Sequence, residues 1–153
     1  MPVEHDDRFG RTLALAHKAV HECIDERMAE HGASLATWLV LHHAVEEPDL
    51  SQSHLAARLV IEAPTLVRHL DRLEADGLLA RTRDARDRRV VRVRVTDEGR
   101  KVESRLRAVA DEMNAELRAA LGTDDEIVQR SLERIREFAL ASLAERKSHA
   151  TAS

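Results

Sequence analysis

The stretch APTLVRHLDRLEADGLLARTRDARDRRVVRVRVTDEG, residues 63–99, changes its hydrophobic period partway along. In its first half, leucines recur every three or four residues, at Leu66, Leu70 and Leu73. That spacing predicts an amphipathic helix, which begins near Pro64 and ends before Gly77. After Gly77 the period is two, and alternating valines and arginines predict strands at 78–83 and 90–95. The stretch therefore predicts a helix followed by a β-hairpin.

The hairpin region is strongly basic. Residues 81–94 contain seven arginines and two aspartates, a local charge of +5, whereas the whole chain of 153 residues carries −4. The arginines stand at positions 81, 83, 86, 88, 89, 92 and 94. The rest of the chain therefore carries −9, so an acidic body holds one basic arm. For nucleic-acid binding the location of the charges matters more than their sum, so the negative net charge does not exclude a nucleic-acid partner.

Amphipathic helices are predicted on both sides of this stretch. The first covers residues 13–28, and two short helices follow Ser34 and Ser51, which are good N-caps. After the hairpin, Thr96 caps a long fifth helix, and residues 123–126 form a capping box for a sixth. Three short helices followed by a hairpin are the parts of a winged helix-turn-helix.

We therefore expect a mainly α-helical chain with one small β-hairpin. Residues 34–99 are expected to form a winged helix-turn-helix DNA-binding part, residues 1–33 and 100–148 a helical dimerisation part, and residues 149–153 a disordered tail. The apolar stripes of the first, fifth and sixth helices are too long for so small a monomer to cover. We therefore expect a homodimer whose interface buries on the order of 2,000 Å² or more of accessible surface.

The helix within residues 63–99 carries the first set of expected DNA contacts. Its outward-facing residues are Thr65, Arg68, His69 and Arg72. In a winged helix-turn-helix the second helix of the turn enters the major groove, where Arg68 can offer a bidentate fork to guanine and Arg72 can hold the backbone. Taken alone, these four residues could instead form a polar helix face that only contacts solvent. The arginine-rich loop beside the helix favours the interpretation that they contact DNA.

That loop supplies the second set of expected contacts, in the minor groove: Arg86, Asp87, Arg88 and Arg89. Arginine suits a narrow, strongly negative minor groove. Asp87 lies two residues before Arg89 and is expected to brace its guanidinium by a charge-assisted hydrogen bond. Two-fold symmetry of a dimer then requires an imperfectly palindromic operator with half-sites about one helical turn apart.

Residues 63–99 resemble the signature of the MarR family of transcriptional regulators. The shared pattern is a recognition helix, L-x-x-x-G-L, a D-x-R step before an alternating valine strand, and T-x-x-G. The resemblance implies an obligate dimer built by the first, fifth and sixth helices. It also implies that Asp87 and Arg89 brace the wing tip and insert it into the minor groove. Ala63 departs from the pattern, because a hydroxyl cap is common there, and Glu62 departs from it by placing a negative charge close to DNA.

Control by a small organic effector is expected at the second helix, where Trp38 and His42 lie one turn apart. The resemblance places an effector pocket beside this helix, and His17 and His21 of the first helix are its further expected ligands. Two readings stay open. His17 and His21 are four residues apart and can share a metal ion, and Cys23 can sense oxidants, although the chain has no tyrosine to partner it.

Other classes of protein are disfavoured. No glycine-rich loop, nucleophile elbow or pair of catalytic carboxylates is present, so an enzyme is not expected, and neither is a cofactor or a dedicated metal site. No apolar run is long enough to span a membrane, and the N-terminus does not resemble a signal peptide, which predicts a cytoplasmic protein. The remaining alternatives are a metal- or thiol-responsive regulator of the same fold and a winged-helix protein-interaction module.

Overall fold

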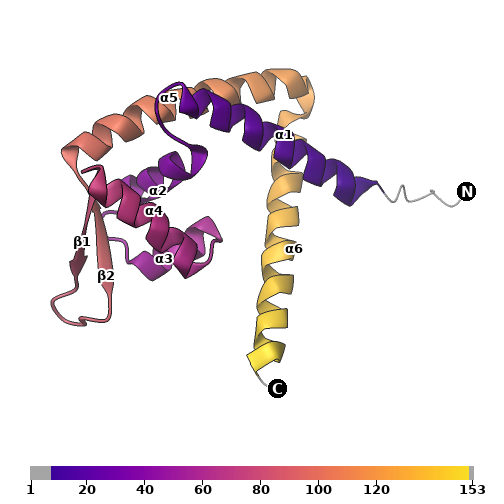
Figure 1. The fold of residues 1–153 in the computed structure, drawn as a ribbon. Helices are drawn as coiled ribbons and strands as arrows, with labels where there is room; N and C mark the ends of the chain where they lie inside the picture. The colour runs from indigo at the N-terminus through magenta and orange to yellow at the C-terminus, as the bar shows by residue number, and fades with distance from the viewer. Residues whose placement is uncertain (1–7, 152–153) are drawn as a thin grey trace, which may run out of the picture. The chain divides into compact units, whose positions relative to one another are not determined.

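The computed structural model describes residues 8–151 and divides the chain into two compact units, one within residues 1–112 and one within residues 113–153. The first unit contains a winged head, residues 34–99, together with α1 and most of α5 (Figure 1). The second contains the end of α5 and α6. The mainly helical architecture with one two-stranded hairpin confirms the expected fold class.

Three short helices open the winged head: α2 (Leu35–Glu46), α3 (Gln52–Leu59) and α4 (Ala63–Ala75). The two predicted serine caps are present. Ser34 Oγ accepts the backbone N–H of Thr37 at 3.1 Å, and Ser51 Oγ accepts that of His54 at 3.2 Å. Each cap satisfies a donor that the first helical turn leaves without a partner.

The turn between α3 and α4 is three residues long. Val60 ends α3 in the left-handed conformation, with φ of 53°, and its N–H bonds back to the carbonyls of Ala56 and Ala57. A β-branched residue rarely adopts this conformation, so the turn is held by the packing on either side of it. Glu62 takes the N-cap position of α4, and Pro64 lies in its first turn.

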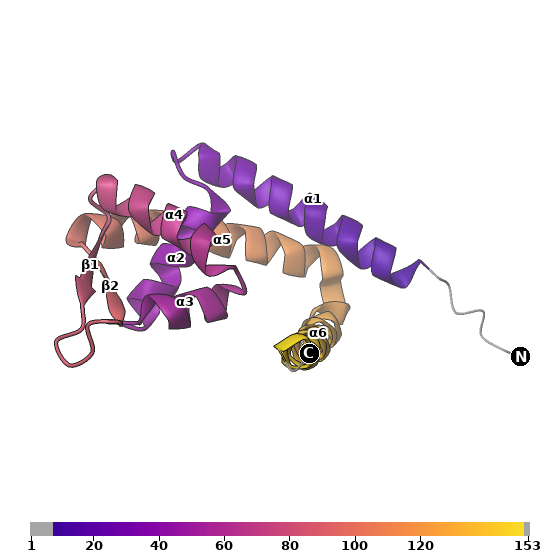
Figure 2. The same ribbon diagram turned by 60° about the horizontal axis from the view of Figure 1, so that its bottom comes forward.

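The wing consists of β1 (Leu79–Arg83) and β2 (Val91–Val95), paired antiparallel with Leu79 opposite Val95. One face is buried, because Val93 is 0% and Val95 8% exposed. The Val93 N–H also bonds to the Leu50 carbonyl at 3.0 Å, so the segment before α3 extends the sheet edge. Beyond the strands, the loop projects past α2, α3 and α4 (Figure 2).

One apolar core joins these elements. It lies between the three short helices and the buried face of the wing. Its fully buried members include Leu41, Leu55, Leu66, Leu70, Leu79 and Val93. The core therefore holds α4 and the hairpin in a fixed mutual arrangement.

The helices α1 (Phe9–Ala29) and α5 (Asp97–Leu121) flank the head. Met28 packs with Leu106, Val109 and Ala110 of α5 in a second, smaller core. The start of α5 is tied to the wing, because Thr96 Oγ1 accepts the Gly99 N–H at 3.0 Å and donates to the Gly77 carbonyl at 2.7 Å. The predicted cap at Thr96 is confirmed.

The second unit contains a short 3₁₀ turn, Gly122–Asp124, and α6 (Asp125–Thr151). The expected helical start at Thr123 is replaced by this turn, and Asp125 Oδ1 accepts the N–H of Glu126 at 2.8 Å. The helix continues through Thr151, past the expected disordered start at residue 149, because no proline or glycine interrupts it. Residues 152–153 lie outside the described chain.

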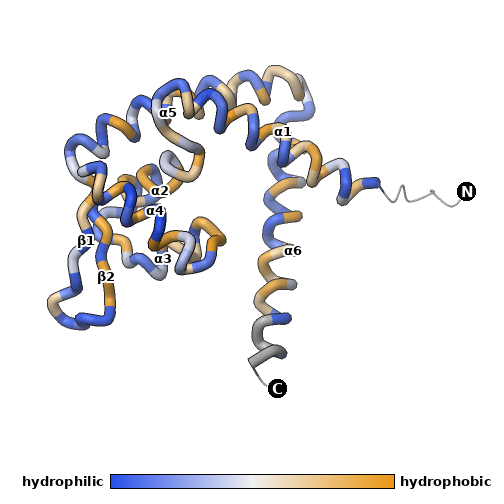
Figure 3. The backbone as a smooth tube through the Cα atoms, in the orientation of Figure 1, coloured by the Kyte–Doolittle hydropathy of each residue, from blue (hydrophilic) through white to orange (hydrophobic). Residues whose placement is uncertain are grey.

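Apolar and polar residues alternate along α6 (Figure 3). Its large apolar side chains are exposed in the single chain: Ile127, Leu132, Phe138, Leu140 and Leu143. Within residues 8–151, no helix is both long and apolar enough to cross a bilayer.

Candidate nucleic-acid interface

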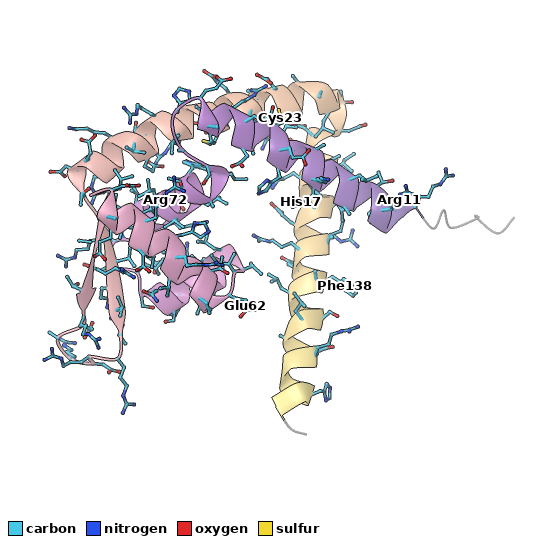
Figure 4. The ribbon with its side chains drawn as sticks, in the orientation of Figure 1. Arg11, His17, Cys23, Glu62, Arg72 and Phe138 are labelled. Carbon is cyan, nitrogen blue, oxygen red and sulfur yellow. The ribbon has the colours of Figure 1, made fainter. Side chains whose placement is uncertain are left out.

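The helix α4 presents one apolar and one polar face. Leu66, Leu70 and Leu73 are 0–3% exposed against the core, and α4 also packs on β1. On the other side, Arg68 and Arg72 are exposed and Thr65 and His69 are half-buried. Figure 4 labels Arg72 near the C-terminal end of this helix and Glu62 at its start. In the described chain the Arg68 and Arg72 guanidiniums have no protein partner, so both are available to a ligand.

The seven arginines of the wing region fall into two classes. Three of them, all on the two strands, are held by carboxylates. Arg81 bonds to Glu74 and Asp71 of α4, and Arg94 makes a two-point contact with the Asp49 carboxylate. Arg92 donates from Nε to Asp84 Oδ2 at 2.9 Å and from Nη1 to the Asp49 carbonyl at 3.1 Å. These cations tie the wing to the rest of the head.

The other class lies in the loop. Arg86, Arg88 and Arg89, hereafter the tip arginines, are exposed, and their guanidiniums have no partner within residues 8–151. Arg83 is intermediate in role, since it donates to the Arg88 carbonyl at 3.1 Å and so stiffens the loop. Side chains fan outward from this loop in Figure 4. The free positive charge of the wing is thus concentrated at its tip.

Asp84 organises the loop, a role that the sequence analysis did not identify. Its Oδ1 accepts the backbone N–H groups of Arg86 and Asp87 at 2.8 and 3.1 Å, while its Oδ2 accepts Arg92. These hydrogen bonds lower the pKa of the Asp84 carboxyl, with the Arg86 amide the largest contributor. An Asp followed by two backbone amides is an Asx-type turn, which was the available sequence signal.

The expected bracing of Arg89 by Asp87 takes a different form. Asp87 Oδ1 accepts the backbone N–H of Arg89 at 3.0 Å, and within residues 8–151 no hydrogen bond or ion pair joins Asp87 to the Arg89 guanidinium. A short side chain two residues upstream reaches the local backbone more easily than the end of a long arginine. Asp87 therefore shapes the loop, and the Arg89 side chain remains free for a partner outside the chain.

A second polar cluster lies where α2 meets α5, and we call it the Trp38–His42 corner. The rings of Trp38 and His42 stack, with centroids 5.0 Å apart. His42 Nδ1 lies 3.0 Å from Oε1 of Glu103, and His42 Nε2 lies 3.5 Å from Glu46. Glu103 is only 2% exposed and is also bonded twice by Arg107.

Glu103 and Arg107 were missed by the sequence analysis. The available signal was a carboxylate between Val102 and Leu106 on an apolar stripe, with an arginine one turn later. A buried carboxylate needs such partners, because an unpaired charge in the core is costly.

The first-helix candidates do not join this corner. His17 and His21 are exposed on α1 with ring centroids 5.9 Å apart, and Cys23 is half-buried on the same helix. In the described part of the chain, no three histidine, cysteine or acidic residues gather in a way that suits a metal ion. The structure thus brings Trp38 and His42 together and leaves His17 and His21 as a separate pair.

Comparison with known proteins agrees with this geometry. A model of the MarR family matches residues 31–90. The transcriptional repressor CouR, solved bound to a 23-mer DNA duplex, is 30% identical, with 84% of this chain and 92% of that chain covered and a TM-score of 0.76. The PcaV transcriptional regulator from Streptomyces coelicolor, solved with its natural ligand, is 30% identical over 91% of this chain and 94% of that chain, with a TM-score of 0.70.

A MarR transcriptional regulator from Methanosarcina mazei Go1 is 25% identical, with 86% of this chain and 96% of that chain covered and a TM-score of 0.75. These similarities extend over nearly the whole chain, well beyond the winged head. The chain belongs to the MarR family of DNA-binding transcriptional regulators.

Proposed function

We propose that the protein is a homodimeric, sequence-specific repressor that a small organic effector releases from DNA. The proposal of DNA binding rests on the exposed arginines of the head whose guanidiniums have no partner in the described chain. These are Arg68 and Arg72 on α4, and Arg86, Arg88 and Arg89 at the wing tip. A structural cation is paired with a carboxylate, as Arg81 and Arg94 are here. Exposed cations without a carboxylate partner match a polyanionic partner.

On this proposal, α4 lies in the major groove and the tip arginines enter the adjacent minor groove. Arg68 reads guanine through a bidentate fork, Thr65 and His69 contact bases or phosphates, and Arg72 holds the backbone. The wing tip carries three exposed cations, and the nearby carboxylates of Asp84 and Asp87 are bonded to backbone amides of the loop. The tip therefore presents positive charge to a narrow groove.

Replacing Arg89 with Ala tests the wing contact. The loss should weaken binding by about 1–3 kcal/mol at matched salt. Fluorescence anisotropy would measure the affinity for the duplex that the parent protein binds most tightly among those it selects from a random-sequence pool. Arg105→Ala removes another exposed arginine, from α5, and should bind like the parent. Unchanged binding by Arg89→Ala would refute the wing contact, whereas Arg68→Ala should mainly relax the base preference.

The proposed dimer rests on the exposed apolar residues of the terminal helices. Phe9, Leu15 and Val20 of α1 are 67%, 57% and 37% exposed, and Phe138 of α6 is 75% exposed. Soluble monomers rarely leave so many large apolar side chains in water along helical stripes. A second copy of the chain is the proposed partner, and a footprint with two half-sites about 10 base pairs apart would support it.

The proposed effector acts at the Trp38–His42 corner. The stacked rings offer an aromatic surface, and Trp38 Nε1 is buried without a hydrogen-bond partner in the described chain. Both nitrogens of His42 already face carboxylates, so an acidic effector would have to replace Glu46 or Glu103 as a partner of His42. Replacement of Glu103 would alter the α2–α5 junction, and the effector would then weaken DNA binding by its differential affinity for the altered state. The exposed His17 and His21 of α1 are the further proposed ligands, and in the single chain they form a pair of their own.

Trp38 fluorescence tests this effector site, because Trp38 is the single tryptophan of the chain. Aromatic acids that release DNA should change its emission and should lose their effect on the His42→Ala variant. Compounds that release DNA from Trp38→Ala and His42→Ala as well as from the parent would contradict the site. Release by peroxide or by a metal ion alone would instead favour Cys23 or the His17–His21 pair.

Repression is tested by transcription from the promoter nearest to the protein's own gene. We expect added protein to lower transcript yield, and a rise in yield would identify an activator. Loss of the effect in Arg89→Ala would link it to DNA binding.

A further inference from the structure

The carboxylate of Asp84 lies at the centre of the wing loop, among the cations that are expected to meet DNA. Its side chain is 20% exposed, and both oxygens are engaged. Oδ1 accepts two loop amides and Oδ2 accepts Arg92 Nε. The loop is closed further by the Asp84 N–H, which donates to the Val90 carbonyl at 2.9 Å.

Arg92 continues this connection into the head. Its Nη1 donates to the carbonyl of Asp49, a residue of the α2–α3 turn that has φ of 63°. The carboxylate of Asp49 in turn holds Arg94, and that contact lowers the pKa of the Asp49 carboxyl. A continuous series of polar contacts therefore runs from the α2–α3 turn through Arg92 and Asp84 to the amides of the tip.

We propose that Asp84 is a positioning residue for DNA binding: through Arg92 it fixes the wing loop in the conformation that projects the tip arginines. The loop is thereby ordered before DNA arrives, and the entropy of ordering it is not lost on binding. Asp84 itself does not contact DNA. This inference rests on the proposed minor-groove contact of the wing.

Simple electrostatics makes the opposite prediction about this residue. Removing a carboxylate from a DNA-facing surface adds one positive charge to it and releases Arg92, so counterion release alone would strengthen binding. A positioning role makes binding weaker, because the tip arginines then sample conformations that miss the groove. The sign of the change separates the two explanations.

Asp84→Asn is the informative substitution. The Asn side-chain oxygen can still accept the Arg86 and Asp87 amides, whereas its NH₂ group cannot accept Arg92 Nε. We expect about tenfold weaker binding to the selected duplex at matched salt, since arginine contacts of the tip are lost. The slope of log affinity against log salt should also become shallower, since fewer phosphates are neutralised.

Asp71→Asn is the matched control. Asp71 is an exposed carboxylate of α4 that pairs with Arg81, and Glu74 still holds Arg81 when it is neutralised. This variant makes the same change in net charge on the head without touching the loop. It should bind DNA as tightly as the parent or more tightly.

A double-mutant cycle tests whether Asp84 acts through Arg92. Arg92→Lys keeps the positive charge but cannot bond to Asp84 and to the Asp49 carbonyl in the same geometry. If the two residues act as one unit, Asp84→Asn should weaken binding much less in the Arg92→Lys background than in the parent. Additive losses would contradict the proposed route. Thermal unfolding of each variant would separate loss of affinity from loss of folding.

The outcomes distinguish this inference from the wing contact itself. If Arg89→Ala binds like the parent, the wing contact fails and the inference fails with it. If Arg89→Ala is weaker but Asp84→Asn binds equally or more tightly, the wing contact stands and the positioning role is overturned. If Asp84→Asn does not fold, Arg92→Lys carries the test, and parental affinity in that folded variant would overturn the proposal.

Discussion

At the scale of single residues, the role of each arginine depends on the carboxylate nearest to it. Arg94 is neutralised by Asp49, whereas the Arg89 guanidinium has no partner in the described chain. The same residue type therefore fastens the wing at its base and supplies free charge at its tip. The surroundings also decide whether a glycine can be replaced. Gly99 is packed so tightly that no side chain fits there.

Gly99→Ala should destabilise the winged head. A Cβ at this position would lie 1.9 Å from the Leu78 carbonyl oxygen and 2.7 Å from Val95 Cγ1, where α5 leaves the wing. The backbone cannot move aside as a flexible side chain can. We therefore expect the free energy of unfolding to fall by about 3 kcal/mol or more, which is the upper end of the usual range for overpacked sites. Urea unfolding would measure it.

Gly10→Ala is the control for this substitution, because nothing lies within 4 Å of the corresponding Cβ on α1. It should leave the free energy of unfolding unchanged or raise it by up to about 1 kcal/mol through helix propensity. Equal stability of the Gly99→Ala and Gly10→Ala variants would contradict the tight packing at the α5 start.

At the scale of elements, α2 joins the two cores of the first unit. Val40, Leu41 and Ala44 belong to the core of the head, and Trp38 packs against the core shared by α1 and α5. The polar residues of α2 lie between these surfaces. His43 is one of them, and its Nδ1 is buried without a hydrogen-bond partner in the described chain.

Stability should fall at mildly acidic pH because of His43. Burial is the main cause that lowers the His43 pKa below 6.5, and the nearby His42 and Arg58 add to it against the opposing effect of Glu46. A lowered histidine pKa means that the unfolded chain binds more protons than the folded one. The stabilising contribution is therefore complete above about pH 6.5 and is lost as the pH falls through the folded-state pKa.

The His43→Gln variant should have a flatter dependence of unfolding free energy on pH between 7.5 and 5.5 than the parent. Urea unfolding at several pH values would measure both. His54→Gln removes an exposed histidine of α3 and serves as the control. A parental slope in His43→Gln would show that other groups cause the acid sensitivity.

At the scale of the whole molecule, the proposed dimer depends on the apolar stripe of α6. With 3.6 residues per turn, Ile127, Leu132, Ile135 and Leu143 fall on one side of this helix, and Arg130 falls on the other. Helix propensity alone does not explain so many exposed apolar residues, whereas a second copy of the chain would cover them.

Leu132→Glu should shift the protein from dimer to monomer. Leu132 is 46% exposed in the single chain, and a carboxylate buried at an apolar interface would be strongly unfavourable. Arg130→Gln makes the same change in charge on the opposite side, where Arg130 only pairs with Glu126. Sedimentation at micromolar concentration should give a dimer for the parent and for Arg130→Gln. A monomeric parent would refute the dimer.

The sequence by itself determined the features that depend on near neighbours. The caps at Ser34, Ser51 and Thr96 and the change of period at Gly77 are set within a few residues, so helices and hairpin were predictable. The segregation of arginine into one arm was likewise visible in the chain order.

Only the tertiary structure decided which of these charges are free. Asp49 and Arg94 are 45 positions apart, and His42 and Glu103 are 61 apart, so no local pattern could have paired them. Even the near pair Asp87 and Arg89 was predicted in the wrong form, because the loop backbone competes with the guanidinium for the carboxylate. The core fixes the spacing of α2, α5 and the wing, and that spacing determines which carboxylates reach which cations.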